Sequence, residues 1–211
     1  MQDVISGAGA CFPEENAAAS EVIGKTLRVL KKLYNLNSEF AEKAYTCNVT
    51  ELFDNLAFCC ELLCSENRKR IIFSYEEEPF YTVCNPKELS WAFLNILVNA
   101  AAHSRGDFIS VTQRTGSDFA QFIIENEGEF QYGSFADALC KSGCGLFRTN
   151  KIISSHGGVI MMNSDSNRTA VSFTVLKKTD SSLPEYKIPS VEDLLYDRLS
   201  IIYTALSGII K

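Results

Sequence analysis

The sequence has no long hydrophobic segment. No apolar run approaches the roughly 20 residues that a helix needs to cross a bilayer, and the chain does not begin with a basic stretch followed by an apolar one. Because a membrane span and a secretory signal each need one of these features, we expect neither in this chain.

Positive charge is also scarce. Lys and Arg together number 20 against 26 Asp and Glu, which gives a formal net charge of -6. The longest basic run is Arg68-Lys69-Arg70. Nucleic-acid binding depends on neutralising many phosphates with clustered Lys and Arg, so we expect no nucleic-acid partner.

Paired cysteine motifs are absent as well. The 8 cysteines include no Cys-x-x-Cys pair with a matching second pair or nearby histidines, so the sequence offers no zinc site. Cys59, Cys60 and Cys64 fall within an apolar helical pattern, where reduced cysteine packs as a small hydrophobic residue. We interpret the cysteines as structural thiols, which indicate a reducing compartment, the cytoplasm.

The 211 residues suffice for one substantial domain and a smaller helical appendage. Residues 17 to 44 show helical periodicity, because Ile23, Leu27, Leu30 and Tyr34 recur at spacings that place them on one face. This face packs either against a partner helix, as in a homodimer, or against the chain's own domain. The spacing is compatible with both.

The rest of the chain alternates between helical and strand patterns. We predict helices over 48–65, 86–103 and 146–155, strands over 70–75, 108–112, 119–124, 159–163 and 169–176, and a last helix beginning near Ser190. Antiparallel hairpins with helices between them predict an α+β fold, a two-layer sandwich with a mixed, mainly antiparallel sheet and helices on one face. We expect three parts: an N-terminal helical segment (1–47), a central domain (48–178), and a linker with a C-terminal amphipathic helix (179–211).

Two asparagines lie within the otherwise apolar helix predicted over 86–103. Asn95 and Asn99 are four residues apart and therefore project from the same face. A buried asparagine is costly unless its amide finds partners. This pair either caps neighbouring backbone groups or faces a ligand, and Ala100 leaves room beside it.

Glycines follow at two later points of the sequence. Asn126 and Gly128 come directly after a predicted buried strand, and Gly143 and Gly145 come directly before a predicted helix. Glycines before a helix let backbone N–H groups approach a phosphate, and the helix N-terminus favours negative charge. Each motif alone is weak evidence for a phosphate-binding site, but the order and spacing of the motifs together are much more specific.

This series resembles the histidine-kinase branch of the ATPase superfamily that also includes gyrase and the ninety-kilodalton heat-shock chaperones. Those kinases have an Asn-x-x-x-Asn-Ala helix, an Asp-x-Gly-x-Gly turn, a Gly-x-Gly-x-Gly-Leu loop and a helix ending in His-Gly-Gly. The corresponding segments here are 95–100, 126–128, 143–146 and 156–158, and the match covers about 130 residues. The resemblance implies the ATP-binding domain of a sensor kinase in two-component signalling, with a response regulator or partner kinase as partner.

At the phosphate end, the resemblance implies a magnesium site. Asn99 would coordinate the Mg²⁺ that bridges the ATP phosphates, with Asn95 assisting, and an amide oxygen is a suitable hard ligand for this ion. Gly143, Gly145 and Leu146 belong to the loop that would face the phosphates.

At the adenine end, the resemblance implies four further contacts. His103 stands where the family often has an aromatic ring against the adenine, and Asn126 stands where an aspartate accepts a hydrogen bond from the adenine amino group. Gly128 would let the backbone approach the base, and Thr169 would support the adenine contact.

Several positions depart from the family pattern. Asn126 replaces the aspartate, and its amide oxygen accepts a hydrogen bond without charge assistance. Phe130 and Lys141 replace glycines, Ala102 replaces a basic residue, and Arg168 replaces the glycine before Thr169. These departures, with a short lid over 127–142, favour the alternative of a degenerate, non-catalytic scaffold or docking module.

The phosphoryl acceptor is not where the resemblance would place it. The only histidines are His103 and His156, both within the ATP-binding region. The acceptor therefore lies in sequence outside this chain, or the protein does not autophosphorylate. We interpret His156 as a helix cap and name no catalytic residue. A serine kinase of the anti-sigma-factor type is a third reading, ranked last because it would need a glutamate at Asn95.

Overall fold

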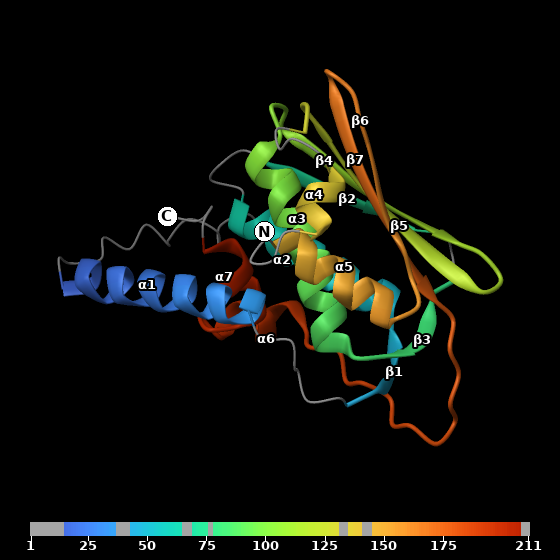
Figure 1. Cartoon of the computed structure of the whole chain (residues 1–211). Helices are drawn as coiled ribbons and strands as arrows, with labels where there is room; N and C mark the ends of the chain where they lie inside the picture. Colours follow the sequence, from blue (N-terminus) through green and yellow to red (C-terminus); the bar gives the residue numbers. More distant parts are fainter. Residues whose placement is uncertain are drawn as a thin grey trace, which may run out of the picture.

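A five-stranded sheet organises the chain, as the computed structural model in Figure 1 shows. The strand order is β2-β4-β5-β7-β6; β2 and β4 are parallel and the other pairs are antiparallel. The strands are Arg70–Ser74 (β2), Phe108–Thr115 (β4), Phe119–Glu127 (β5), Ile160–Ser164 (β6) and Arg168–Leu176 (β7). The structure describes residues 15–36, 43–64, 69–75, 78–130, 135–140 and 145–207.

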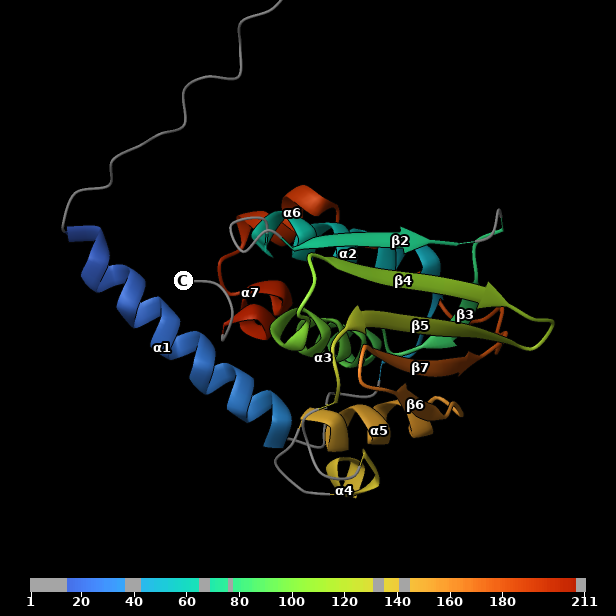
Figure 2. The ribbon, with the colours of Figure 1, turned by 90° about the horizontal axis from the view of Figure 1, so that it is seen from above.

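Helices cover one face of this sheet, and α1 lies beyond them at one side (Figures 1 and 2). The helices are Glu15–Leu36 (α1), Val49–Cys64 (α2), Pro86–His103 (α3), Phe135–Cys140 (α4), Gly145–Ser155 (α5), Val191–Tyr196 (α6) and Ile201–Leu206 (α7). The predicted α+β fold, with a mainly antiparallel mixed sheet and helices on one face, is confirmed.

The core lies between the sheet and α2 and α3. Side chains alternate between the two faces of a strand, so Val111 and Phe122 are buried under the helices while Phe108 and Phe119 are exposed on the other face. Phe53 of α2 sits at the centre of this core, where its ring centroid lies 4.3 Å from that of Phe93 and 4.7 Å from that of Phe122. This aromatic cluster fixes α2 and α3 against the sheet.

Two short strands form a second sheet. β1 (Tyr45–Asn48) pairs antiparallel with β3 (Tyr81–Cys84). The segment after the last long strand also joins β1, because Thr46 N–H donates to the Pro184 carbonyl at 3.0 Å and Tyr186 N–H donates to the Thr46 carbonyl at 2.8 Å. The segment that follows β7 thus returns to β1, the first strand of the domain.

The sequence prediction was wrong around these strands. The helix predicted to reach residue 44 ends at Leu36 in the described chain, and residues 45–48 form a strand. β1, β3 and α4 had not been predicted. Elements of four to six residues carry too little periodicity to be recognised, and the two strands exist through pairing with distant segments.

The C-terminal prediction was partly wrong. The predicted start of the helix at Ser190 is confirmed by a capping box, in which Ser190 Oγ accepts from Asp193 N at 3.1 Å and Asp193 Oδ2 accepts from Ser190 N at 3.2 Å. The single helix, however, is divided into α6 and α7. Between them Asp197 Oδ1 accepts from Leu199 N at 2.9 Å, and such a local side-chain bond competes with continued helix.

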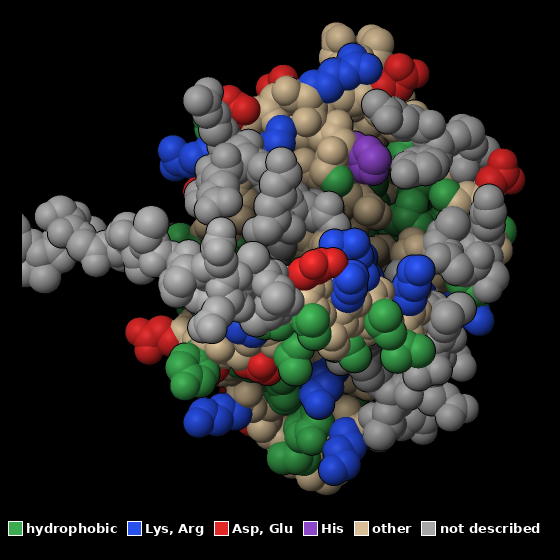
Figure 3. Space-filling view, turned by 90° about the vertical axis from the view of Figure 1, so that its left-hand side faces the viewer, with side chains coloured by type: hydrophobic (Ala, Val, Ile, Leu, Met, Phe, Trp, Pro, Cys, Tyr) green, Lys and Arg blue, Asp and Glu red, His purple; other side chains and the backbone are tan. Residues whose placement is uncertain are grey.

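α6 and α7 bury their apolar faces on the domain itself. Leu194 and Ile202 belong to the main core. α1 in turn packs on α7 through Leu27, which is 5% exposed. The opposite face of α1 leaves apolar side chains in solvent, and Figure 3 shows hydrophobic side chains among basic ones on this side of the molecule. The exposed apolar residues of α1 are Val22, Val29 and Leu33 on this opposite face, and Ile23, one turn before Leu27.

The described cysteines are free, and most are buried. Cys59, Cys60 and Cys64 of α2 face the core, as predicted for structural thiols. Burial raises the pKa of the Cys59 thiol to about 11, so it stays protonated near neutral pH. No helix in the described segments is long and apolar enough to cross a membrane.

Candidate functional site

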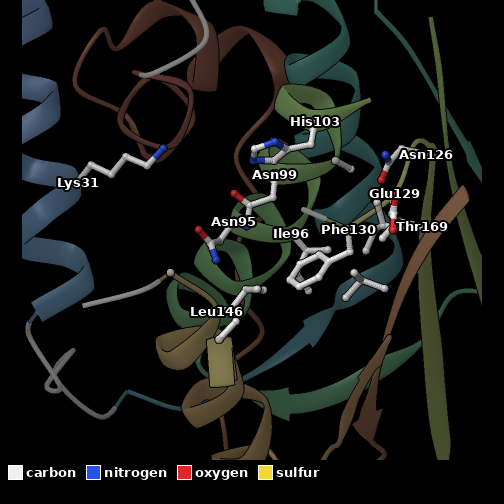
Figure 4. Close-up of a pocket in the computed structure, with 15 residues that line it drawn as sticks. Lys31, Asn95, Ile96, Asn99, His103, Asn126, Glu129, Phe130, Leu146 and Thr169 are labelled. Carbon is white, nitrogen blue, oxygen red and sulfur yellow. The ribbon is translucent and has the colours of Figure 1, made fainter. Parts of the chain in front are cut away.

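A cavity of about 310 Å³ opens between α3, α5 and the sheet, with α1 at one side (Figure 4). Most of the predicted site residues line it. They are Asn95, Asn99, His103, Asn126, Gly145, Leu146 and Thr169. Gly128 does not line it, and Gly143 lies outside the described residues.

The central wall of the cavity is α3. Its first turn is fixed by Asn85, whose side-chain oxygen accepts from Glu88 N at 3.4 Å, and by Pro86 at the first helical position. Every side chain from Leu89 to Val98 is buried. This burial fixes the helix in rotation and holds Asn95 and Asn99 toward the cavity.

Asn95 and Asn99 differ in their partners. Asn95 is 7% exposed, and its amide N–H donates to Thr149 Oγ1 of α5 at 2.9 Å. Asn99 is partly exposed, and its side-chain amide has no hydrogen-bond partner within the described part of the chain. The sequence left two readings open, a structural pair or a ligand-facing pair. Asn95 has the structural bond, and Asn99 remains available to a ligand.

The N-terminus of α5 lies directly against Asn95. A Cβ on Gly145 would overlap the Asn95 side-chain oxygen, so only glycine permits this approach. Thr149 Oγ1 donates to the Gly145 carbonyl at 3.0 Å and accepts from Asn95. The first turn of α5 is therefore held against Asn95, and its residues Gly145 and Leu146 line the same cavity.

The opposite end of the cavity is built from β5 and β7. Asn126 is 7% exposed, and its amide nitrogen donates to the Glu127 carbonyl at 3.1 Å. Its amide oxygen has no donor among the described residues, so it can accept one from a ligand. The assignment of oxygen and nitrogen follows from this bond.

Gly128 shapes this end without lining it. Its φ is 121°, which an L side chain rarely adopts, and its carbonyl accepts from Thr169 Oγ1 at 2.7 Å. Ser164 Oγ lies 2.8 Å from Thr169 Oγ1 and accepts from Phe130 N at 3.0 Å. With Thr169 donating to Gly128, Ser164 donates to Thr169, and this chain of bonds fixes the loop that carries Phe130.

Phe130 contributes an aromatic ring to the wall of the cavity. Its ring lies among the other lining side chains in Figure 4, and its centroid is 6.0 Å from that of Phe135 in α4. α4 supplies Ala138 to the same cavity and so forms a short cover. Arg168 does not line the cavity; its guanidinium pairs with Glu125 at 3.3 Å.

The charged lining residues lie at opposite sides. Figure 4 shows Lys31 of α1 on the side of Asn95 and Asn99, and Glu129 beside Asn126 and Thr169. The cavity is therefore polarised, with a cation at one end and a carboxylate at the other. Such a cavity suits a ligand that is anionic at one end and carries hydrogen-bond donors at the other.

Sequence reasoning missed Lys31. It lies in a helix without any motif, far from the other site residues in sequence. The available signal was its spacing, because Lys31 comes four residues after Leu27 and shares that residue's inward face.

His156 serves the scaffold, as predicted. Its ring Nδ1 bonds the Ile152 carbonyl at 2.8 Å in the last turn of α5, and its Nε2 accepts from Asn85 N at 3.1 Å. The proton is therefore on Nδ1, and the neutral ring joins the end of α5 to the start of α3. Burial lowers the pKa of His156, because the charged form loses its hydration.

We expect this histidine to make the fold sensitive to mild acid. Because the folded pKa lies below the unfolded value of about 6.5, the stabilising contribution is complete above that pH and is lost as pH falls below it. The free energy of unfolding should drop by up to about 1.4 kcal/mol per pH unit there. Urea unfolding between about pH 7 and about pH 5.5 measures this, and a His156→Gln variant should show a smaller slope. Equal slopes in both proteins would contradict the assignment.

Comparison with known proteins assigns the fold. No protein-family model matches the chain, and no curated protein matches it in sequence. The histidine kinase AdeS of Acinetobacter baumannii matches with a TM-score of 0.61 at 15% identity, over 81% of this chain and 89% of that one. The catalytic domain of the histidine kinase ThkA matches with a TM-score of 0.56 at 17% identity, over 65% and 97%. Full-length ShkA in complex with AMPPNP matches with a TM-score of 0.60 at 13% identity, over 79% and 38%.

Proposed function

We propose that this chain, which has the fold of histidine-kinase catalytic domains, is the ATP-binding domain of a sensor kinase-like signalling protein. The observation that carries the proposal is the polarised cavity, in which the unpartnered amide of Asn99 and the glycine-permitted approach of α5 face one end. The unpartnered oxygen of Asn126 faces the other end. Phosphates suit the first end, and an aromatic base with an amino group suits the second.

At the base end, Asn126 would accept a hydrogen bond from the adenine amino group. Thr169 would act through Gly128, since it fixes the backbone beside Asn126. His103, at the end of α3, and Leu146, in the first turn of α5, line the cavity and would pack against the nucleotide. Gly143 is proposed for the phosphate loop on the resemblance alone.

At the phosphate end, Asn99 would supply an amide oxygen to Mg²⁺, with the Asn95 oxygen beside it. Among the described residues no group of three His, Cys, Asp or Glu side chains could hold a metal ion. A cation in this cavity must therefore obtain most of its ligands from phosphate oxygens and water, which is how Mg²⁺ is usually bound in nucleotide sites.

Bound Mg-ATP would supply the γ-phosphoryl group for transfer to a histidine. That histidine is neither of the two in this chain, because His156 joins two helices inside the fold and His103 belongs to the cavity. We propose an acceptor outside this chain, followed by a response regulator. The exposed apolar residues of α1, such as Val22 and Val29, support a proposed homodimer that forms through this helix. The free thiols support a location in the cytoplasm, where cysteines stay reduced.

The alternative is a non-catalytic scaffold with weak nucleotide binding or none. It is favoured by Phe130, whose ring occupies part of the cavity. Asn126 also accepts a weaker hydrogen bond than the aspartate of the family, and Ala102 supplies no charge on α3.

Calorimetric titration of ATP, with and without Mg²⁺, decides between these functions. We expect micromolar binding that needs Mg²⁺, and at least about tenfold weaker binding in Asn99→Ala, because the loss of one metal ligand costs 1.4 kcal/mol or more. Asn163→Ala, an exposed asparagine of β6 away from the cavity, should bind like the wild type. No binding at millimolar ATP would reject the kinase-type function and leave the scaffold.

A further inference from the structure

Lys31 is held at the cavity by contacts on two sides. One turn before it, Leu27 is buried against the domain. Its own ammonium group donates to the Ala205 carbonyl in the last turn of α7 at 2.6 Å. The lysine is partly buried and lines the same cavity as Asn95 and Asn99. α1 therefore presents a positioned cation to the phosphate end of the proposed nucleotide site.

No carboxylate neutralises this cation within the described chain. The ion pairs among the described residues involve Lys25, Arg70 and Arg168, but not Lys31. Glu129, the acidic lining residue, lies on the far side of the cavity in Figure 4. Position 102 of α3, where the family has a basic residue, is alanine. Lys31 is thus the one lysine or arginine among the described lining residues.

The geometry leaves the ammonium group ready for an anion. It has three N–H donors, and the Ala205 carbonyl uses one of them. Partial burial removes water from the charge and lowers the pKa of Lys31, a cost that a bound anion would offset. Phosphate oxygens held at Asn99 would lie on the side of the cavity from which Lys31 approaches.

We propose that Lys31 is the phosphate-binding cation of this nucleotide site, supplied by α1 in place of the basic residue missing from α3. This rests on the proposed function. Because the same side chain joins α1 to α7, nucleotide binding and docking of α1 on the domain stabilise each other. The coupling is reciprocal, as thermodynamic linkage requires. The nucleotide thereby strengthens the docking of α1 on the domain.

Affinities for ATP and for adenosine, both measured with Mg²⁺ in the full chain, test the assignment. Lys31→Met keeps the aliphatic stem and removes the charge. We expect it to weaken ATP binding about tenfold to a hundredfold, the worth of a charge-assisted hydrogen bond, and to leave adenosine binding unchanged. Lys31→Arg should retain most of the ATP affinity. The matched control is Lys32→Met, the adjacent exposed lysine of the same helix, which should bind ATP like the wild type.

Hydrogen exchange of α1 tests the coupling. In the wild type, ATP should slow exchange of the α1 amides, and in Lys31→Met it should not. Equal ATP affinities in the wild type and Lys31→Met would overturn the role of Lys31 while the proposed function stands. A parallel loss of adenosine binding would mean that Lys31 acts only on the fold, which also overturns it. A wild type that binds no ATP would reject the proposed function and this inference together.

Discussion

Replacing Gly158 with alanine is expected to lower the free energy of unfolding by at least about 3 kcal/mol. A Cβ at this position would overlap the backbone carbonyl oxygen of Thr174 in β7. Gly158 N also donates to the Ile153 carbonyl at 2.9 Å, and Ile153 is fully buried. Neither backbone can yield without separating α5 from the sheet, so relief of the overlap costs core packing.

Gly106→Ala is the matched control for this substitution. A Cβ there meets only the carboxylate end of Glu127, which is exposed and can rotate away. We expect that variant to lose less than about 1 kcal/mol, an ordinary value for a surface substitution. Chemical denaturation of both variants measures the difference. Similar losses in the two would mean that β7 accommodates a side chain at Gly158.

Phe53→Ala should cost about 3–5 kcal/mol, the range for removing a fully buried phenylalanine. The Phe53 ring is 0% exposed and contacts three others, stacking on Phe93 of α3 and meeting Phe122 and Phe173 of the sheet edge-on. Its removal leaves a cavity directly under α3. Because Phe93 lies two residues before Asn95, we also expect weaker Mg-ATP binding in this variant.

Phe58→Ala on the same helix provides the comparison. Phe58 is 49% exposed, and its truncation should change the free energy of unfolding by no more than about 1 kcal/mol. Urea titrations of the two variants, with the slope m recorded to confirm unchanged compactness, isolate the packing contribution. A difference below about 1 kcal/mol would show that the aromatic cluster is not the centre of the core.

The elements around α3 were predictable because their signals are local. The apolar periodicity of residues 86–103, the proline and asparagine at the start of that helix and the glycines before α5 each determine structure within a few residues. The four-residue spacing of Asn95 and Asn99 was enough to place them on one helix face. That they share one cavity with Asn126 and Thr169 was implied by the family resemblance and not by these local patterns.

The remaining features depend on segments that are distant in sequence. β1 is a strand because it pairs with β3 and with the chain around Pro184. A pattern of four residues is too short to predict such pairing. Lys31 reaches the cavity only because α1 packs on α7. The break between α6 and α7 comes from one side-chain bond of Asp197, which competes with helix in a way that apolar periodicity does not reveal.

The pairing of residues 184–186 with β1 also determines when this strand can complete its hydrogen bonds during translation. Thr46 is synthesised before its partners Pro184 and Tyr186, which follow it in the sequence by 138 and 140 residues. At roughly 5–20 residues per second, translation leaves this strand without those partners for about 7–28 s. The carbonyl of Ala205 that anchors Lys31 is made later still. Phe173, the last ring of the aromatic core in the sequence, precedes Ala205 by only 32 residues, so the core and the anchor of Lys31 become available within about 2–6 s of each other.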